Sequence, residues 1–223
     1  MATGSQQKQE LFKAIWATAE DLRNSVDGWD FKSYVLGILF YRFISENITN
    51  YINRMQREAG DADFDYAGFS DEEAAAAKDD LVREKGFFIL PSQLFCNVRK
   101  RAKNDPNLNV TLDNTFKAIE ASAIGTESEP DLKGLFADID VNSNKLGSTV
   151  EKRNEQLTKI LNNIGNIDLK GDYAENKIDL FGDAYEFLMS MYASNAGKSG
   201  GEYYTPQEVS ELLARIVCHG REY

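Results

Sequence analysis

Hydrophobic residues recur along most of the chain at the three- and four-residue spacing of amphipathic helices. The pattern starts at Leu11 and is interrupted by Asp27-Gly28. A second, longer helix is expected to be capped by Asp30 and to end at Gly60. Its apolar face is wide near the middle and narrows toward Arg57, so its centre is expected to be buried and its far end solvated.

Capping signals and glycines mark the start and end of two further helices. Ser70 to Glu73 has the spacing of a capping box, and the alanine-rich segment behind it stops at Gly86. Ser148 to Glu151 is a second box of this kind. It predicts a helix with Val150 on the buried side and Gly165 as the stop.

The segment between these helices mixes helical and extended patterns. Residues 87–90, Phe-Phe-Ile-Leu, are apolar and closed by Pro91, which is typical of an extended segment or a short strand. Helices are expected from about Ser92, over 108–124 and from Asp179. With about seven helices and at most a short strand pair, the fold class is predicted to be mainly α, a helical bundle built by packing apolar faces.

Composition narrows the chemistry that the chain can support. Hydrophobic residues make up 42% of the 223 residues, enough for a packed core. The longest apolar run, residues 34–44, contains Arg42 and is too short to span a bilayer, and no cationic and apolar leader opens the chain. Cys96 and Cys218 are typical of reduced thiols in a cytoplasmic protein. No spacing suits a zinc site, and nucleophilic catalysis would depend on His219 alone.

The net charge of −11 disfavours the chain as a free-standing DNA-binding domain, because phosphate neutralisation supplies most of the affinity of such domains. An approach to DNA within a larger assembly with basic partners stays open. The one basic cluster comprises Arg99, Lys100, Arg101 and Lys103 at a predicted helix end. These cations serve either the helix dipole and solubility or contacts to phosphate.

The most distinctive stretch is "GKSGGEYYTPQEVSELLARIV", residues 197–217. Thr205 and Pro206 suit the N-cap and the first position of a helix, with Glu208 at the third. Tyr203 and Tyr204 follow flexible glycines and place aromatic faces beside free helix N–H groups, which suits an anionic small molecule with a flat or cationic group. A glycine linker, a buried tyrosine pair and a capped helix explain the same residues without a ligand.

Three segments resemble the γ-class N6-adenine DNA methyltransferases, in the form of the modification subunits of type I restriction-modification systems. Residues 200–217 are similar to the family's "GEFYTP" signature and are the specific element. Residues 11–46 resemble the opening of the family's helical N-terminal domain, and residues 179–193, "DLFGDAYEFLMSMYA", resemble the helix before the signature. The order and spacing also match, so the resemblance covers most of the chain.

The resemblance implies a domain plan. Residues 1–10 are expected to be a frayed N-terminus, and residues 11–170 a helical N-terminal domain. Residues 171–223 are expected to hold a connector, an amphipathic helix and the start of a Rossmann-like methyltransferase domain. The family's catalytic Asn-Pro-Pro-aromatic motif and its Phe-x-Gly-x-Gly turn do not occur in the sequence. We therefore expect an N-terminal piece of a longer protein that is inactive by itself, without catalytic residues or a metal site of its own.

The implied cofactor is S-adenosylmethionine, near whose methionine moiety the signature lies in this family. Carried over by position, the lining residues are Glu202, Tyr203, Tyr204, Thr205, Pro206 and Gln207. Phenylalanine is common in the family at one of the two aromatic positions, so tyrosine at both is a mild departure that keeps the ring.

For the complete protein, the resemblance implies a cytoplasmic, adenine-specific DNA methyltransferase that transfers a methyl group from S-adenosylmethionine to N6 of adenine. Its implied partners are a DNA-specificity subunit, a restriction subunit, a second copy of the modification subunit and double-stranded DNA, with no membrane. The helical domain would serve subunit assembly and DNA enclosure. Two alternatives stay open: a non-catalytic acidic helical interaction module, and a solitary or fused γ-class methyltransferase that carries its own target-recognition region.

Overall fold

The computed structural model describes residues 12–13, 15–17, 28–167, 186–187, 205 and 207–219. Contacts divide the chain into two units, residues 16–168 and residues 1–15 together with 169–223. Every regular element among the described residues is a helix, and no strand is assigned within them. The prediction of a mainly α fold is confirmed.

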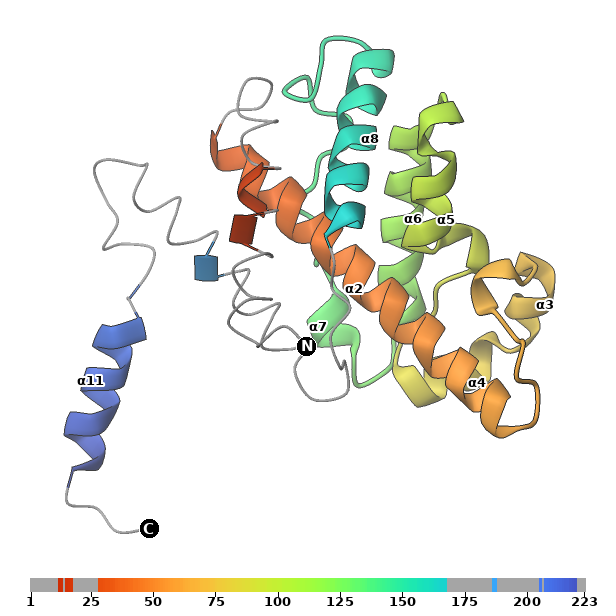
Figure 1. Ribbon diagram of the computed structural model, residues 1–223, viewed down its shortest axis with the longest axis horizontal. Coiled ribbons are helices and arrows are strands. Elements are labelled where there is room, and N and C mark those ends of the chain that lie inside the picture. The colour runs from red at the N-terminus through yellow and green to blue at the C-terminus, as the bar shows by residue number, and fades with distance from the viewer. Residues whose placement is uncertain are drawn as a thin grey trace. The chain divides into compact units, whose positions relative to one another are not determined.

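The unit of residues 16–168 is built around one long helix, α2 (Gly28–Glu58), which runs diagonally across it in Figure 1. The other helices of this unit are η1 (Tyr66–Gly68), α3 (Asp71–Ala76), α4 (Lys78–Lys85), η2 (Pro91–Gln93), α5 (Phe95–Arg101), η3 (Ala102–Asn104), α6 (Leu108–Ser122), α7 (Glu129–Leu132) and α8 (Val150–Asn166). α2 packs against α5 and α8, and α8 packs against α6.

α2 is buried along its middle and solvated at its end, as its apolar pattern predicts. Its buried apolar residues are Tyr34, Val35, Ile38, Leu39, Tyr41, Ile44, Ile48 and Ile52, whereas residues 54–58 are exposed. The predicted cap is wrong, because α2 begins at Gly28 and Asp30 lies inside it. A glycine is tolerated there, since the first N–H groups of a helix have no intrahelical partner in any case.

The first predicted capping box is confirmed, whereas the second is displaced by one residue, because Thr149 and not Ser148 caps α8. The Ser70 hydroxyl accepts a hydrogen bond from the Glu73 N–H at 3.2 Å and donates to its carboxylate at 2.5 Å. Thr149 accepts from the Lys152 N–H at 3.3 Å and opens α8. Gly86 ends α4 in the left-handed conformation, at φ +79°, which a residue with a Cβ rarely adopts.

Two predictions for α8 are wrong. Val150 is 40% exposed rather than buried, because it is the first residue of α8 and lies beyond the core that the rest of the helix covers. Gly165 does not stop the helix, which continues to Asn166. The Arg99 side chain packs directly against Gly165, where any Cβ would overlap the guanidinium. The glycine therefore permits a close approach instead of forming a turn.

Residues 87–95 cross the core without a strand partner; we call them the core-crossing segment. Side chains from other elements satisfy their backbone groups. The Tyr66 hydroxyl donates to the Ile89 carbonyl at 2.8 Å, and the Tyr41 hydroxyl donates to the Gln93 carbonyl. The Ser122 hydroxyl accepts from the Phe88 N–H at 2.9 Å. The prediction for residues 87–90 is thus met by its extended alternative.

The second unit has fewer described residues. Within it the Phe12 ring stacks on the Phe187 ring, with centroids 4.4 Å apart and planes 10° from parallel. Ile15 is fully buried. α11 (Gln207–Cys218) forms where the sequence predicts a helix behind Thr205 and Pro206. Of the amphipathic helix predicted from Asp179, residues 186 and 187 are described, and both are helical. The rest of that predicted helix lies outside the described residues.

Candidate functional site

The predicted cofactor-lining segment, residues 202–207, is described only in part. Thr205 is exposed and precedes α11, whose first residue is Gln207. Glu202, Tyr203, Tyr204 and Pro206 lie outside the described residues. The role of all six residues remains a prediction.

α11 presents an apolar stripe at helical spacing: Val209, Leu212, Leu213, Ile216 and Val217, each between 44% and 62% exposed. On the polar side Arg215 pairs with Glu211 at 2.5 Å, which is the i,i+4 arrangement. Cys218 and His219 are exposed at its end. The stripe has the spacing of a core face, yet it is solvent-accessible along its whole length.

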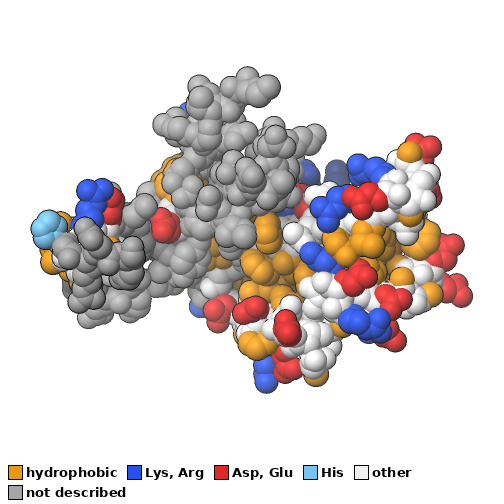
Figure 2. Space-filling model, turned by 90° about the horizontal axis from the view of Figure 1, so that it is seen from below, with side chains coloured by type: hydrophobic (Ala, Val, Ile, Leu, Met, Phe, Trp, Pro, Cys, Tyr) orange, Lys and Arg blue, Asp and Glu red, His pale blue; other side chains and the backbone are white. Residues whose placement is uncertain are grey.

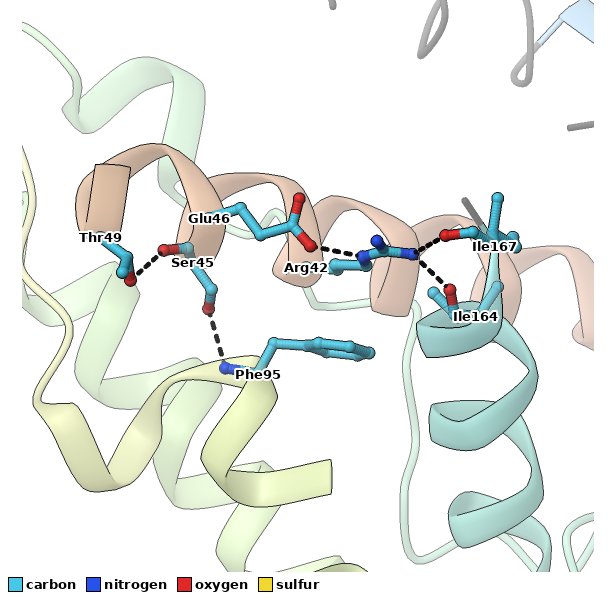
Figure 3. Close-up of polar contacts among 7 residues, drawn as sticks. All are labelled: Arg42, Ser45, Glu46, Thr49, Phe95, Ile164 and Ile167. Carbon is cyan, nitrogen blue, oxygen red and sulfur yellow. Dashed lines mark hydrogen bonds and ion pairs between the residues drawn. The ribbon is translucent and has the colours of Figure 1, made fainter. Parts of the chain in front are cut away.

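Arg42 is the most enclosed charge in the described part of the chain (Figure 3). Its Nε donates to the Glu46 carboxylate at 2.7 Å. Its Nη1 donates to the carbonyl of Ile164 at 2.6 Å and to that of Ile167 at 2.9 Å. Those carbonyls belong to the C-terminal turn of α8, where the helix dipole is negative and a cation is stabilised.

Arg42 belongs to a polar seam on α2, which we define as Arg42, Ser45, Glu46 and Thr49. The Ser45 hydroxyl accepts from the Phe95 N–H, the first N–H of α5, at 3.1 Å. The Thr49 hydroxyl donates to the Ser45 carbonyl at 2.8 Å. These residues recur every three or four positions, so they share one face of α2. The seam joins the end of α8 and the start of α5 to the central helix.

Sequence reasoning missed the seam, although one signal was present. Arg42 is the lone cation in an apolar run of eleven residues, 34–44. A cation at the centre of a buried helix must be satisfied by partners, because an unpaired buried charge is very costly. The carbonyls that satisfy it are 122 and 125 residues away in the chain, which no local pattern reveals.

The seam connects α2 to α8 and α5, and two titratable groups lie close to it in the chain. Burial raises the pKa of the Tyr41 phenol well above its usual value, so the hydroxyl stays protonated and donates to the core-crossing segment. Burial also raises the pKa of the Cys96 thiol, which keeps it in the less nucleophilic form. No three His, Cys, Asp or Glu side chains among the described residues are grouped to hold a metal ion.

A pocket of about 280 Å³ lies at the far end of α2. Its lining is Tyr51, Ile52, Met55, Gln56, Phe64, Tyr66, Phe69, Ala74, Ala77, Asp80, Leu81 and Glu84. Its two carboxylates are already bonded, since Glu84 accepts from the Tyr51 hydroxyl at 2.8 Å and Asp80 pairs with Arg83 at 2.9 Å. The pocket is therefore an apolar hollow without a free acid–base pair.

On the face drawn in Figure 2, hydrophobic side chains reach the surface between charged ones.

Two families match adjacent ranges of the chain. Residues 11–164 match the family described as HsdM N-terminal domain. Residues 176–222 match the family described as N-6 DNA Methylase, and this range includes α11 and residues 202–207. None of the described helices combines the length and apolar character needed to cross a membrane.

Curated relatives and a solved structure agree with these matches. The chain is 51% identical over 220 residues to the methylase subunit of the type I restriction enzyme MpnII of Mycoplasma pneumoniae, covering 96% of this chain and 40% of the relative. It is 21% identical to the MjaIX methylase subunit of Methanocaldococcus jannaschii, covering 93% and 35%. The crystal structure of a type I restriction-modification methyltransferase subunit from Streptococcus thermophilus superimposes with a TM-score of 0.76 at 29% identity, covering 96% and 44%. The chain thus spans less than half the length of these proteins.

Proposed function

Because the chain belongs to the family of HsdM N-terminal domains, we propose that it acts as the N-terminal part of a type I DNA-methyltransferase subunit. The observation that carries the proposal is the order of two matches in one chain, an HsdM N-terminal domain over 11–164 followed by an N-6 DNA Methylase match over 176–222. The chain covers 40%, 35% and 44% of the lengths of the three relatives, whose names describe them as methylase or methyltransferase subunits.

The complete protein, in this proposal, transfers a methyl group from S-adenosylmethionine to N6 of adenine in DNA. The carbon–sulfur bond of the sulfonium breaks, a carbon–nitrogen bond to N6 forms, and the amine loses one proton. The family description, N-6 DNA Methylase, supports this chemistry. The chain itself supplies no catalytic group, since it lacks an Asn-Pro-Pro-aromatic motif.

Residues Glu202, Tyr203, Tyr204, Thr205, Pro206 and Gln207 line one wall of the cofactor pocket in this proposal. Two features of the described residues support it. Thr205 is exposed, and α11 begins directly behind it at Gln207. The free N–H groups of a helix start favour a carboxylate such as that of the cofactor's methionine moiety. Tyrosine rings favour the sulfonium.

The helical unit of residues 16–168 serves assembly. We propose that it contacts a DNA-specificity subunit, a restriction subunit and a second modification subunit, and that it helps to enclose double-stranded DNA in the cytoplasm. Two features support a scaffolding role for this unit. Its polar seam connects α2 to α8, and the carboxylates in its pocket are already bonded to neighbouring side chains.

Calorimetric titration of S-adenosylmethionine into this chain and into the complete subunit tests the proposal. We expect binding by the complete subunit only, and weaker binding after Tyr203→Ala, with Tyr51→Ala in the helical unit as the matched control. Transfer of labelled methyl groups to DNA, followed by nucleoside analysis, should give N6-methyl-2′-deoxyadenosine. A complete subunit that does not bind the cofactor, or label found on cytosine, would contradict the proposal.

A further inference from the structure

The basic strip, which we define as Arg99, Lys100, Arg101 and Lys103, lies at the end of α5 and in η3. No acidic residue occurs between Glu84 and Asp105. The strip is therefore a local excess of four positive charges, while the remainder of the chain carries −15, since the total is −11. A run of four cations without an acidic neighbour in an acidic protein calls for a physical explanation.

Carboxylates of the described residues do not neutralise the strip. None of its four cations forms an ion pair among the residues that the structure describes. Lys100 and Lys103 are exposed. The carboxylate that follows the strip, Asp105, accepts instead from the Asn107 N–H at 2.9 Å and the Thr111 hydroxyl at 2.7 Å.

Neutral amides hold Arg99 in place. Its Nε donates to the Asn162 side-chain oxygen at 3.3 Å, and an Nη donates to that of Asn166. Gly165, without a Cβ, leaves room for the guanidinium between them. The amides orient the group and leave its charge uncompensated, and they use two of its five N–H donors. Burial and the nearby Arg42 lower the pKa of Arg99, as expected for a cation whose neighbours include another cation.

The dipole of α5 accounts for only part of the strip, since Arg99, Lys100 and Arg101 lie in the last turn of this helix. The dipole effect is confined to the last turn of a helix, and Lys103 lies beyond α5 in η3. The negative end of α8 is already occupied by Arg42, which donates to the carbonyls of Ile164 and Ile167.

We propose that the basic strip contacts the phosphate backbone of duplex DNA. The guanidinium fork suits phosphate oxygens, and exposed lysines add mobile point charges. Asparagine amides, such as exposed Asn104 beside the strip, are common donors to phosphate and carry no repulsive charge. Contacts of this kind position a protein on DNA and read no sequence, which leaves recognition to other parts of an assembly. The inference rests on the proposed function.

The test is Lys100→Gln/Lys103→Gln in the complete subunit, assembled into its methyltransferase complex. Both side chains are exposed and bond to no described residue, so folding should be preserved. The matched control is Lys78→Gln/Lys152→Gln, on α4 and α8, with two exposed lysines and the same change in net charge. DNA binding is measured by fluorescence anisotropy over a range of salt concentrations, with two duplexes of unrelated sequence, and methyl transfer is measured in parallel.

We expect the strip variant to bind both duplexes about tenfold more weakly than the control, and its salt slope to fall by roughly 0.9 for each lost phosphate contact. Equal affinities and slopes in variant and control would overturn the inference. So would a variant whose assembly is weakened but whose assembled fraction binds DNA as the control does, because that result would assign the strip to an acidic protein surface. The proposed function is judged separately by wild-type methyl transfer: with transfer intact and slopes equal, only the strip inference fails.

Discussion

Replacing Arg42 by methionine should destabilise the helical unit strongly. The substitution keeps an unbranched side chain of similar reach and removes the guanidinium that donates to the carbonyls of Ile164 and Ile167. Hydrogen bonds to a charged group contribute roughly 1.5–3 kcal/mol each, so the two carbonyl bonds account for about 3 kcal/mol at the lower value. The lower value applies because the variant no longer buries a charge, which offsets part of the loss. Glu46, whose side chain is 34% exposed, can be rehydrated and adds little.

The assay is urea unfolding of the chain followed by circular dichroism. With a slope near 2 kcal/mol/M, a loss of about 3 kcal/mol lowers the midpoint by roughly 1.5 M without changing the slope. Arg54→Met is the matched control, because Arg54 lies on the same helix and faces Glu58 at 4.0 Å, with side chains 66% and 72% exposed. That surface pair should contribute less than about 0.5 kcal/mol. If the two variants were equally stable, the seam would not support the packing of α8 as we argue.

Three further predictions concern packing, capping and titration. Gly37→Ala should lower the free energy of unfolding by about 1–3 kcal/mol, because the added Cβ would overlap the side chain of Ile139. Gly68→Ala is the control, since its Cβ would meet open space, and equal melting temperatures of the two variants would contradict the prediction. Ser70→Ala should cost about 1 kcal/mol by removing the cap of α3, and an unchanged melting temperature would count against it. Burial raises the pKa of the Tyr41 and Tyr66 phenols, so stability should be full below pH ~10 and fall above it, as unfolded tyrosines ionise first. Ultraviolet titration should show these two phenols ionising only with unfolding; early ionisation would refute their burial.

Helix boundaries were predictable where their cause is local. Ser70 caps α3 through a bond that reaches only three residues along the chain, and Gly86 acts through its own backbone angle. At α8 the prediction placed the cap one residue early, at Ser148 instead of Thr149. The failure at Gly165 came where a distant residue decides. Gly165 has the usual look of a helix stop, but Arg99 from α5 gives it a different role. Asp30 has the usual look of a cap, but α2 begins before it.

The family resemblance read from three segments is confirmed by the matches over 11–164 and 176–222. It came from motif order, which needs no knowledge of packing. The polar seam could not be found in that way, because its partners lie more than a hundred residues from Arg42. The assignment of residues 202–207 to a cofactor stays a prediction, since it depends on side chains outside the described residues.

Substitutions should be tolerated better within the core-crossing segment than at the distant side chains that bond to its backbone. Its acceptors and donors at Phe88, Ile89 and Gln93 are backbone groups, which every residue type except proline supplies in full. The groups that meet them are side chains, the hydroxyls of Tyr41 and Tyr66 among them, and no other residue type can replace those at the same reach. Genetic variation in the segment itself should therefore be open to apolar residues of similar volume, while the distant tyrosines that bond to it should be nearly invariant in any library selected for folding.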